Sequence, residues 1–216
     1  MTVSRVIVVD DHRAVIEGIR GLLHDLPEFE IVGVAVHGRQ AVKRVASLLP
    51  DMVIMDISMP NLNGLDTTLQ IKKQYPDIKI IVYSMHSERE YVVGLFKAGV
   101  SGYVLKDSPL SELVLALKTV RQKGTYFSAA TQTILQQYVA DLETGLKKDA
   151  FDRLSLRERE VLQLLAEGYS IKEIAGQLCV SPKTVETHKY NMMAKLDTNR
   201  LADLIKIAIR KKLITL

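Results

Sequence analysis

The sequence predicts an α/β fold, built as a doubly wound parallel sheet, followed by a smaller all-α domain. Four short apolar runs, at 6–9, 52–55, 80–83 and 103–105, lack polar alternation, which is typical of strands buried on both faces of a parallel sheet. Segments with helical spacing of apolar residues separate these runs. Beyond residue 153 only helical patterns follow, so the two parts of the chain should differ in architecture.

Five helices are expected to alternate with the strands of the first part. Residues 13–26 carry apolar side chains at helical spacing and are followed by Pro27. Ser108 and Pro109 form an N-cap followed by proline at the first helical position, which opens the last of the five helices. We expect these helices at 13–26, 38–49, 65–75, 88–97 and 109–123.

Each of the four apolar runs stops at a residue that could handle a phosphoryl group. Asp10 and Asp11 follow the first run, Asp56 the second, Ser84 the third and Lys106 the fourth. The carboxyl ends of parallel strands gather at one edge of an open sheet, where ligands bind. Any one of these residues could simply end a strand or face solvent, but all five together favour a chemical site.

The chemistry of these groups suggests a metal-assisted phosphoryl acceptor. Carboxylates held close together repel one another unless a cation intervenes, and Mg²⁺ prefers one or two carboxylates together with waters and phosphate oxygens. A carboxylate beside such an ion can accept a phosphoryl group as an aspartyl phosphate, and Asp56 is the expected acceptor because it stands alone on the central strand. Lys106 and Ser84 suit the new phosphate oxygens.

Four motifs resemble the receiver domain of two-component response regulators. They are Asp10-Asp11-His12, the stretch from Asp56 to Gly64, Ser84-Met85-His86 and the stretch from Gly102 to Lys106. The resemblance covers roughly residues 3–123 and implies a (βα)5 flavodoxin-like sheet of strand order 2-1-3-4-5. It also implies that Mg²⁺ lies at Asp11 and Asp56, with Asp10 reaching the ion through water. The backbone carbonyl of Ser58 is the implied third protein ligand.

The resemblance further assigns a switch to Ser84 and Tyr103. Tyr103 matches an aromatic position that turns inward when Ser84 moves toward the phosphate, although Tyr103 could equally be an ordinary strand aromatic. Serine replaces the commoner threonine at 84 and keeps the hydroxyl. Asp107 follows Lys106 where many receivers have proline, which puts the familiar cis peptide there in doubt.

The second part of the chain has the pattern of a helix-turn-helix. Ser155 with Glu158, and Ser170 with Glu173, are capping boxes that open two helices. After a turn at 179–181, proline at 182 opens a longer helix to about residue 196, and a fourth helix should open at 199. A short helix, a tight turn and a longer helix form the arrangement that presents its second helix to the DNA major groove.

The segment 154–196 resembles the LuxR/FixJ-type DNA-binding domain. By this resemblance Glu186, Thr187 and Tyr190 fall at base-reading positions, where Glu186 could accept a hydrogen bond from cytosine N4. A plain solvated helix face is the alternative, and His188 is expected to pack or to donate to a phosphate rather than to bind metal. The expected DNA-binding residues are Lys183, Thr184, Glu186, Thr187, His188, Lys189 and Tyr190.

The last helix carries more apolar surface than one core needs. Its apolar residues from 201 to 213 cover an arc of roughly 240°, whereas a helix packed on a single core needs about 100°. The surplus predicts a homodimer that binds paired half-sites, with a tightly wrapped monomer core as the alternative. The expected dimer residues are Leu201, Leu204, Ile205, Ile207, Ala208 and Ile209.

Charge and composition agree with this division of the chain. Residues 147–216 hold 14 Lys plus Arg and 9 Asp plus Glu, so a chain of net charge +4 carries its basic excess in the helical part, as expected for DNA binding. We expect a receiver at 1–124, a linker at 125–152 that includes a helix at 129–142, and a DNA-binding domain at 153–216. The single cysteine, the absence of a secretion signal and the lack of an apolar run of about 18 residues favour a cytoplasmic protein.

Together these features predict a phosphorylation-controlled DNA-binding transcription regulator with Mg²⁺ as cofactor. Its partners should be a sensor histidine kinase and double-stranded DNA, with no membrane. It should not be an enzyme beyond catalysing its own phosphoryl transfer and dephosphorylation. Two alternatives are a Mg²⁺-dependent aspartyl-phosphate phosphohydrolase and a constitutive, non-phosphorylated DNA-binding regulator. The phosphohydrolase normally places its nucleophile after the first strand and carries a cap domain, for which no segment is present here.

Overall fold

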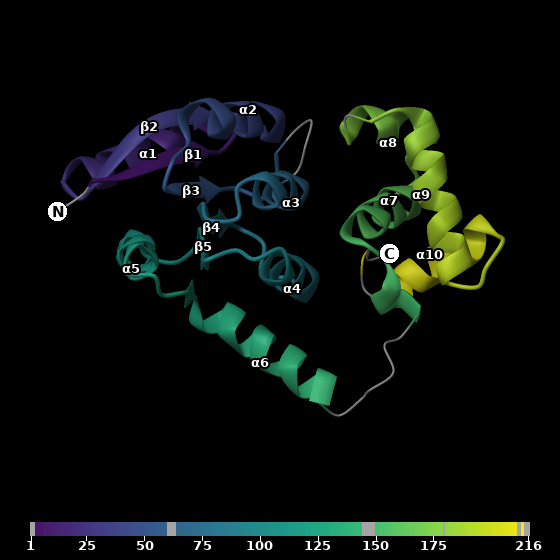
Figure 1. Ribbon diagram of the computed structural model, residues 1–216. Helices are drawn as coiled ribbons and strands as arrows, with labels where there is room; N and C mark the ends of the chain where they lie inside the picture. Colours follow the sequence, from purple (N-terminus) through teal and green to yellow (C-terminus); the bar gives the residue numbers. More distant parts are fainter. Residues whose placement is uncertain (1–2, 60–63, 144–149, 179, 211–212, 214–216) are drawn as a thin grey trace. The chain divides into compact units, whose positions relative to one another are not determined.

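The chain folds into two compact units, which are described separately here. The computed structural model describes residues 3–59, 64–143, 150–178, 180–210 and 213. The units comprise Met1–Glu143 and Thr144–Leu216 (Figure 1). Part of the receiver-like motif, at 60–63, and Cys179 in the expected turn lie outside the described residues. Among the described helices, none is long and apolar enough to cross a membrane.

The first unit is a parallel sheet of six strands in the order β2-β1-β3-β4-β5-β6. The expected parallel α/β sheet is therefore confirmed, and its first five strands have the order 2-1-3-4-5. The strands are β1 (Ser4–Val9), β2 (Phe29–Ala35), β3 (Met52–Met55), β4 (Lys79–Ser84), β5 (Gly102–Leu105) and β6 (Tyr126–Phe127).

Two strands had no clear sequence signal. The edge strand β2 is mostly half-buried, so its sequence, Phe-Glu-Ile-Val-Gly-Val-Ala, mixes polar and apolar residues instead of forming a continuous apolar run. Strand β6 has only two residues, too few for any periodic pattern, yet it extends the sheet beyond β5.

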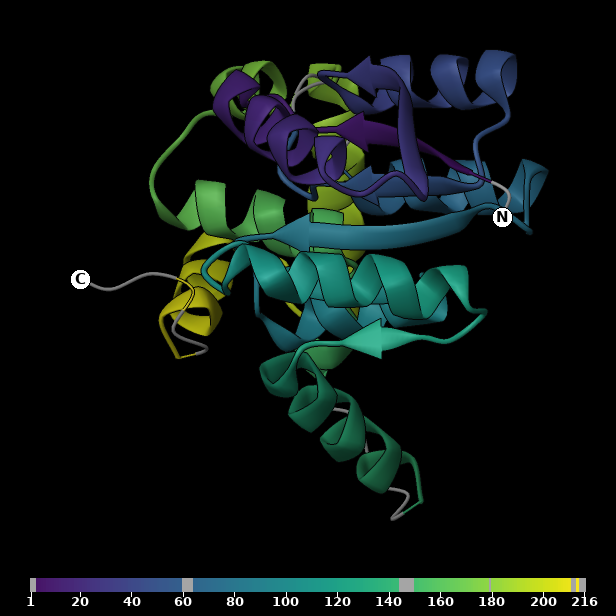
Figure 2. The same ribbon diagram turned by 90° about the vertical axis from the view of Figure 1, so that its left-hand side faces the viewer.

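Helices cover both faces of the sheet, which makes the unit doubly wound. They are α1 (Arg13–His24), α2 (Gly38–Leu48), α3 (Gly64–Gln74), α4 (Arg89–Lys97), α5 (Leu110–Arg121) and α6 (Ala129–Glu143). Buried residues of α1 and α5 share one core cluster, and those of α2, α3 and α4 share the other. Figures 1 and 2 show α1 and α5 together on one side of the sheet. Helix α5 begins one residue later than predicted, with Pro109 at the N-cap instead of the first helical position.

Helix α6 packs against α4 and so belongs to the first unit. Arg89 at the start of α4 forms an ion pair with Asp141, and the Lys97 ammonium at the end of α4 lies 4.8 Å from the centre of the Tyr138 ring. The sequence had placed this helix inside a linker. Its contacts with α4 instead make it part of the structure that surrounds the sheet.

The second unit is a small helical domain held together by one apolar core. It contains a short 3₁₀ helix (Ala150–Arg153), α7 (Leu156–Ala166), α8 (Ile171–Gln177), α9 (Pro182–Lys195) and α10 (Leu201–Arg210). Both expected capping boxes are present, and the Ser181 side chain caps α9 by accepting from the Thr184 amide. The fourth helix begins at 201, two residues later than predicted.

An ion pair between a buried carboxylate and a more exposed lysine ties α7 to α9 in this unit. The Lys195 ammonium lies 2.9 and 2.7 Å from the two carboxylate oxygens of Glu158, which is almost fully buried. Burial by itself would raise the pKa of Glu158, but the hydrogen bonds from Lys195 and from the Ser155 amide lower it. Glu158 also forms the capping box of α7 with Ser155. The ion pair therefore fixes the start of α7 to the end of α9.

Gly64 at the start of α3 allows the close approach of two backbone segments. A Cβ atom there would lie 2.2 Å from the Asp56 carbonyl oxygen and 2.7 Å from the Ile57 Cα, while the Gly64 amide donates to the Ile57 carbonyl at 2.8 Å. Backbone cannot move aside as a flexible side chain can. This glycine therefore fixes the segment that carries Asp56.

We predict that Gly64→Ala destabilises the first unit by about 2–4 kcal/mol, because the added methyl group forces the Asp56 backbone to shift. Gly18→Ala in α1 is the matched control, since a Cβ there meets no atom within 4 Å, and it should stabilise the unit by up to about 1 kcal/mol. Scanning calorimetry, with hydrogen exchange to assign the transition, measures both effects. Equal stabilities of the two variants would contradict the prediction.

Candidate functional site

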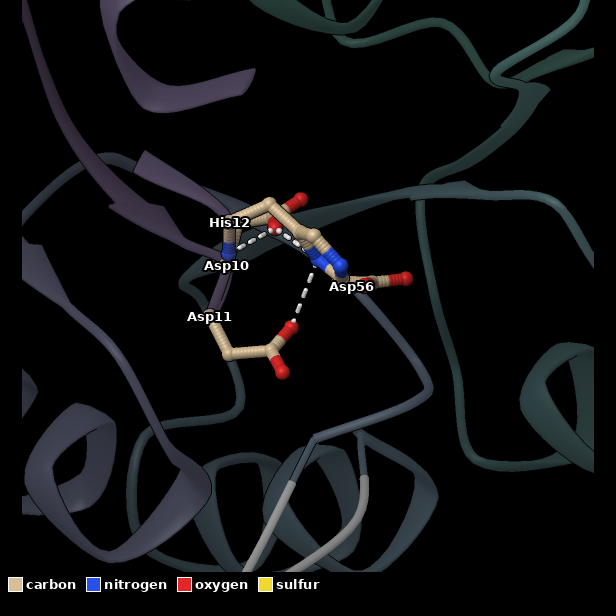
Figure 3. A group of neighbouring side chains, drawn as sticks. All are labelled: Asp10, Asp11, His12 and Asp56. Atoms are coloured by element: carbon tan, nitrogen blue, oxygen red, sulfur yellow. Dashed lines mark hydrogen bonds and ion pairs between the residues drawn. The ribbon is translucent and has the colours of Figure 1, made fainter. Parts of the chain in front are cut away.

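An acidic group lies at the carboxyl ends of β1 and β3. Asp10, Asp11, His12 and Asp56 each offer a ligand atom, and these atoms all lie within 4.8 Å of one another (Figure 3). Asp10 and Asp56 are only 2% and 4% exposed, whereas Asp11 faces solvent. The parallel sheet thus brings Asp56 beside two carboxylates that lie 45 and 46 positions earlier in the sequence, as the strand ends suggested.

Lys106, at the end of β5, bridges the two buried carboxylates. Its ammonium lies 2.7 Å from Asp10 Oδ2 and 2.9 Å from Asp56 Oδ2. Burial by itself would lower the pKa of Lys106, but the hydrogen bonds to Asp10 and Asp56 outweigh it and raise the pKa. The lysine therefore stays charged and offsets the cost of burying two carboxylates.

Backbone amides fix the remaining oxygens of these carboxylates. Asp56 Oδ1 accepts from the Ile57 amide at 2.7 Å, and Asp10 Oδ1 accepts from the His12 amide at 2.8 Å. The His12 imidazole Nδ1 lies 3.3 Å from Asp10 and 3.0 Å from Asp11. In the sequence, His12 stands out only as part of the Asp10-Asp11-His12 motif, and its position directly after two aspartates is the signal for this contact.

Ser84 and Tyr103 meet at the backbone of His86. Ser84 is fully buried at the end of β4, and its hydroxyl accepts from the His86 amide at 3.3 Å. Tyr103 is also fully buried, and its hydroxyl donates to the His86 carbonyl at 2.7 Å. Burial raises the pKa of Tyr103, so it stays a neutral donor. Tyr103 therefore points inward in this structure, and its role as a switch stays a prediction.

The edge of the site that Ser58, His86 and Glu88 form is polar and largely exposed. The exposed Ser58 lies two residues after Asp56, and its hydroxyl is 2.6 Å from His86 Nε2. Nδ1 of the same ring is 3.1 Å from a carboxylate oxygen of Glu88. Glu88 has no signal in the sequence, because its contact with His86 depends on the shape of the loop between β4 and α4.

The donor set suits a hard divalent cation. Asp10, Asp11 and Asp56 supply carboxylate oxygens, which are the side-chain ligands that Mg²⁺ prefers, and one edge of the group is open to solvent for water or phosphate ligands. The bridging ammonium of Lys106 already neutralises part of the carboxylate charge. These residues could therefore hold one divalent ion, with Asp11 as the most accessible ligand.

The second unit presents a polar helix face on α9. Val185 and Met192 are fully buried, whereas Glu186 and Thr187 are exposed and Tyr190 is 80% exposed. The expected DNA-contact residues differ in their exposure. Lys183 is exposed, and Thr184, His188 and Lys189 are half-buried. The Thr187 hydroxyl donates to the Lys183 carbonyl at 2.9 Å, which leaves its methyl group and oxygen lone pair for a ligand.

The structure corrects part of the expected dimer surface on α10. Leu204 and Ala208 are fully buried in the core of their own unit, so they cannot contribute to a contact with a second copy. Ile207 also packs partly against that core. A helical wheel gives the width of an apolar arc but not the part of it that neighbouring helices cover. Leu201, Ile205 and Ile209 keep exposed or half-exposed surface.

Comparison with protein families matches both units. Residues 6–118 match the response regulator receiver domain. Residues 152–208 match the luxR family of bacterial regulatory proteins. The two matches cover the acidic site and the helix-turn-helix region respectively, and they favour a regulator over the phosphohydrolase alternative.

Similar proteins extend over nearly the whole chain. The chain is 38% identical over 215 residues to the oxygen regulatory protein NreC of Staphylococcus epidermidis, covering 97% of this chain and 99% of that protein. It is 36% identical over 214 residues to NreC of Staphylococcus aureus, with the same coverage. The two-domain arrangement is therefore shared with these relatives from end to end.

Solved structures with both domains are similar in fold. The response regulator RcsB of Salmonella typhimurium has a TM-score of 0.70 and 29% identity, covering 97% of this chain and 98% of that one. RcsB bound to the promoter rprA with the phosphate mimic BeF₃⁻ has a TM-score of 0.65 and 29% identity, covering 95% and 98%. The chain belongs to the response regulators that join a receiver domain to a DNA-binding domain of the LuxR family.

Proposed function

We propose that this protein is a transcription regulator in which phosphorylation of Asp56 controls binding to DNA. The observation that carries the proposal is the Lys106 ammonium, which holds the buried Asp10 and Asp56 carboxylates at 2.7 and 2.9 Å beside the accessible Asp11. A buried carboxylate beside a cation and further carboxylate ligands is arranged to accept a phosphoryl group.

The residues of the site divide the chemistry of phosphoryl transfer between them. Asp56 supplies the attacking oxygen, and the Ile57 amide orients its carboxylate from the other oxygen. Asp10, Asp11, Asp56 and the backbone carbonyl of Ser58 would hold Mg²⁺, which neutralises the charge on the phosphoryl oxygens. Lys106 would exchange its bond to Asp56 for one to the incoming phosphate. Apart from this transfer and the later loss of the phosphate, the protein needs no enzymatic activity.

The new phosphate would act on the β4–α4 segment through Ser84. Phosphorylation adds about two negative charges at Asp56, and the Ser84 hydroxyl, at the end of the neighbouring strand β4, is expected to turn toward them. The Ser84 hydroxyl now accepts from the His86 amide, so its movement would release that amide, while Tyr103, which already points inward, holds the His86 carbonyl. The phosphate can shift the equilibrium between the inactive and the active conformation only by the difference between its free energies of interaction with the two conformations.

The proposed partners follow from the two domains. A receiver domain receives its phosphoryl group from a sensor histidine kinase, and a small acyl phosphate can replace the kinase in solution. Solved structures describe RcsB dimers bound to DNA. We extend this to a homodimer of the present protein on paired half-sites, with Glu186, Thr187 and Tyr190 reading bases and Lys183 contacting phosphate. The setting proposed for this exchange is the cytoplasm.

We predict that Mg²⁺ and acetyl phosphate add one hydroxylamine-sensitive phosphoryl group to the wild-type protein and that Asp56→Asn abolishes it. Hydroxylamine cleaves acyl phosphates, so sensitivity identifies a carboxylate acceptor. Intact mass before and after hydroxylamine gives the answer, and gel filtration of the same samples should show a dimer only for the phosphorylated protein. Asp25→Asn, at an aspartate that is 86% exposed, is the control. A labile adduct that survives Asp56→Asn would refute the assignment.

We predict that Glu186→Ala changes the sequence preference on DNA more than the overall affinity, because a carboxylate can discriminate bases but repels phosphates. One base contact contributes about 1–3 kcal/mol of discrimination. Lys183→Ala should instead weaken binding equally on all sequences. Selection from a random DNA library, followed by titration of selected and unselected fragments, separates the two effects. Equal loss on all fragments for Glu186→Ala would contradict base reading.

We predict that Ile205→Glu lowers affinity for paired half-sites at least about tenfold without changing affinity for one half-site, because a charge there disrupts the proposed dimer contact. Titration of DNA fragments that carry one or two selected half-sites measures this ratio. Leu204→Glu provides the contrast, since Leu204 is fully buried and its substitution should unfold the second unit. Equal effects of Ile205→Glu on both fragments would exclude the dimer role.

A further inference from the structure

Three side chains at the exposed edge of the site form one hydrogen-bonded chain. The Ser58 hydroxyl lies 2.6 Å from Nε2 of His86, and Nδ1 of His86 lies 3.1 Å from the Glu88 carboxylate. Ser58 comes from the segment after β3, whereas His86 and Glu88 come from the loop before α4. These hydrogen-bonded side chains therefore connect two loops that border Asp56.

The Glu88 carboxylate decides which nitrogen of His86 can accept a proton. A carboxylate only accepts hydrogen bonds, so Nδ1 must carry the proton that it donates to Glu88. A ring with its only proton on Nδ1 has its lone pair on Nε2, which lies within hydrogen-bond distance of the Ser58 hydroxyl. Ser58, His86 and Glu88 are thus arranged as a nucleophile, a general base and a carboxylate that orients the base.

Other contacts hold the His86 ring and backbone in place. The ring packs against Tyr91 of α4 with centroids 4.6 Å apart, and the Tyr103 hydroxyl donates to the His86 carbonyl at 2.7 Å. The Ser84 hydroxyl accepts from its amide at 3.3 Å. A base held by its ring and by both backbone polar groups is positioned for proton transfer, as a freely rotating surface histidine is not.

We infer that the Ser58 hydroxyl is a second phosphoryl acceptor, separate from Asp56. It is exposed, it has a base within hydrogen-bond distance, and it borders the place where a phosphodonor must approach Asp56. The inference rests on the proposed function in one respect, since it uses the same donor at the same site.

The transfer step is balanced without any further reactant. With acetyl phosphate as donor, Ser58 Oγ forms a bond to phosphorus while the bond between phosphorus and the acetate oxygen breaks. The acetate leaves with the electron pair, and the hydroxyl proton passes to His86 Nε2 and then to solvent. The products are phosphoserine and acetate. Glu88 touches neither reactant and acts as a positioning residue, by holding the ring in the required tautomer.

The two acceptors give products of different stability. Phosphate on Asp56 is an acyl phosphate, which hydroxylamine cleaves at the acyl carbon. Phosphate on Ser58 is an alkyl ester without an acyl carbon, so it resists hydroxylamine and accumulates once formed. A hydroxylamine-resistant phosphate on Ser58 therefore identifies the second acceptor even when Asp56 is also phosphorylated.

The test is peptide mapping by mass spectrometry of the full chain after Mg²⁺ and acetyl phosphate, followed by hydroxylamine. We expect a resistant phosphate on Ser58 in the wild type and none in Ser58→Ala. His86→Gln, which keeps a polar side chain but cannot take the proton, should slow its formation about 100-fold, as expected for loss of a general base. Ser87→Ala, at an exposed serine of the same loop that is not one of these three side chains, should leave the rate of phosphoserine formation unchanged.

The variants of Glu88 separate positioning from structural support. Glu88→Gln should slow the formation of phosphoserine, and Glu88→Asp should restore part of the rate, because it keeps the charge that selects the tautomer. Absence of resistant phosphate on Ser58, beside a labile adduct on Asp56, overturns this inference and leaves the proposed function intact. Absence of both adducts overturns this inference and the proposed function. A Ser58 adduct that forms equally fast in His86→Gln overturns the assignment of the base.

Discussion

The ammonium of Lys106 between Asp10 and Asp56 is the interaction on which the rest of the first unit depends. Two carboxylates that are almost fully buried would repel each other and resist desolvation, and one cation from a third strand removes both problems. The same contact joins the carboxyl ends of β1, β3 and β5. It also holds one oxygen of Asp56, while the other oxygen accepts from the Ile57 amide.

A continuous series of contacts runs from this centre to the end of the first unit. Ser84 and Tyr103 both bind the backbone of His86, and α4 begins three residues later. Arg89 and Lys97, at the two ends of α4, contact α6. Helix α6 is the last element of the unit before the chain continues to the DNA-binding domain. A change at Ser84 therefore has a short physical route to the segment that joins the domains.

The second unit uses its helices for two purposes at once. Helices α9 and α10 both bury apolar residues in one small core, and the Glu158–Lys195 pair locks α9 to α7. This anchoring keeps the polar face of α9, with Glu186 and Tyr190, in a fixed orientation for a ligand. On α10 the same core takes Leu204 and Ala208, so the surface left for a second copy is narrower than the apolar arc of the helix.

The sequence by itself determined the strands with continuous apolar runs, the capped helices and the set of residues at the strand ends, because these depend on local pattern and on the topology of parallel sheets. Only the tertiary structure placed the edge strands β2 and β6, attached α6 to α4 and assigned Leu204 to the core, because each depends on which neighbour covers a surface. The same holds for the contacts of Glu88 and His12, since loop conformation brings these side chains to their partners and leaves no periodic trace in the sequence.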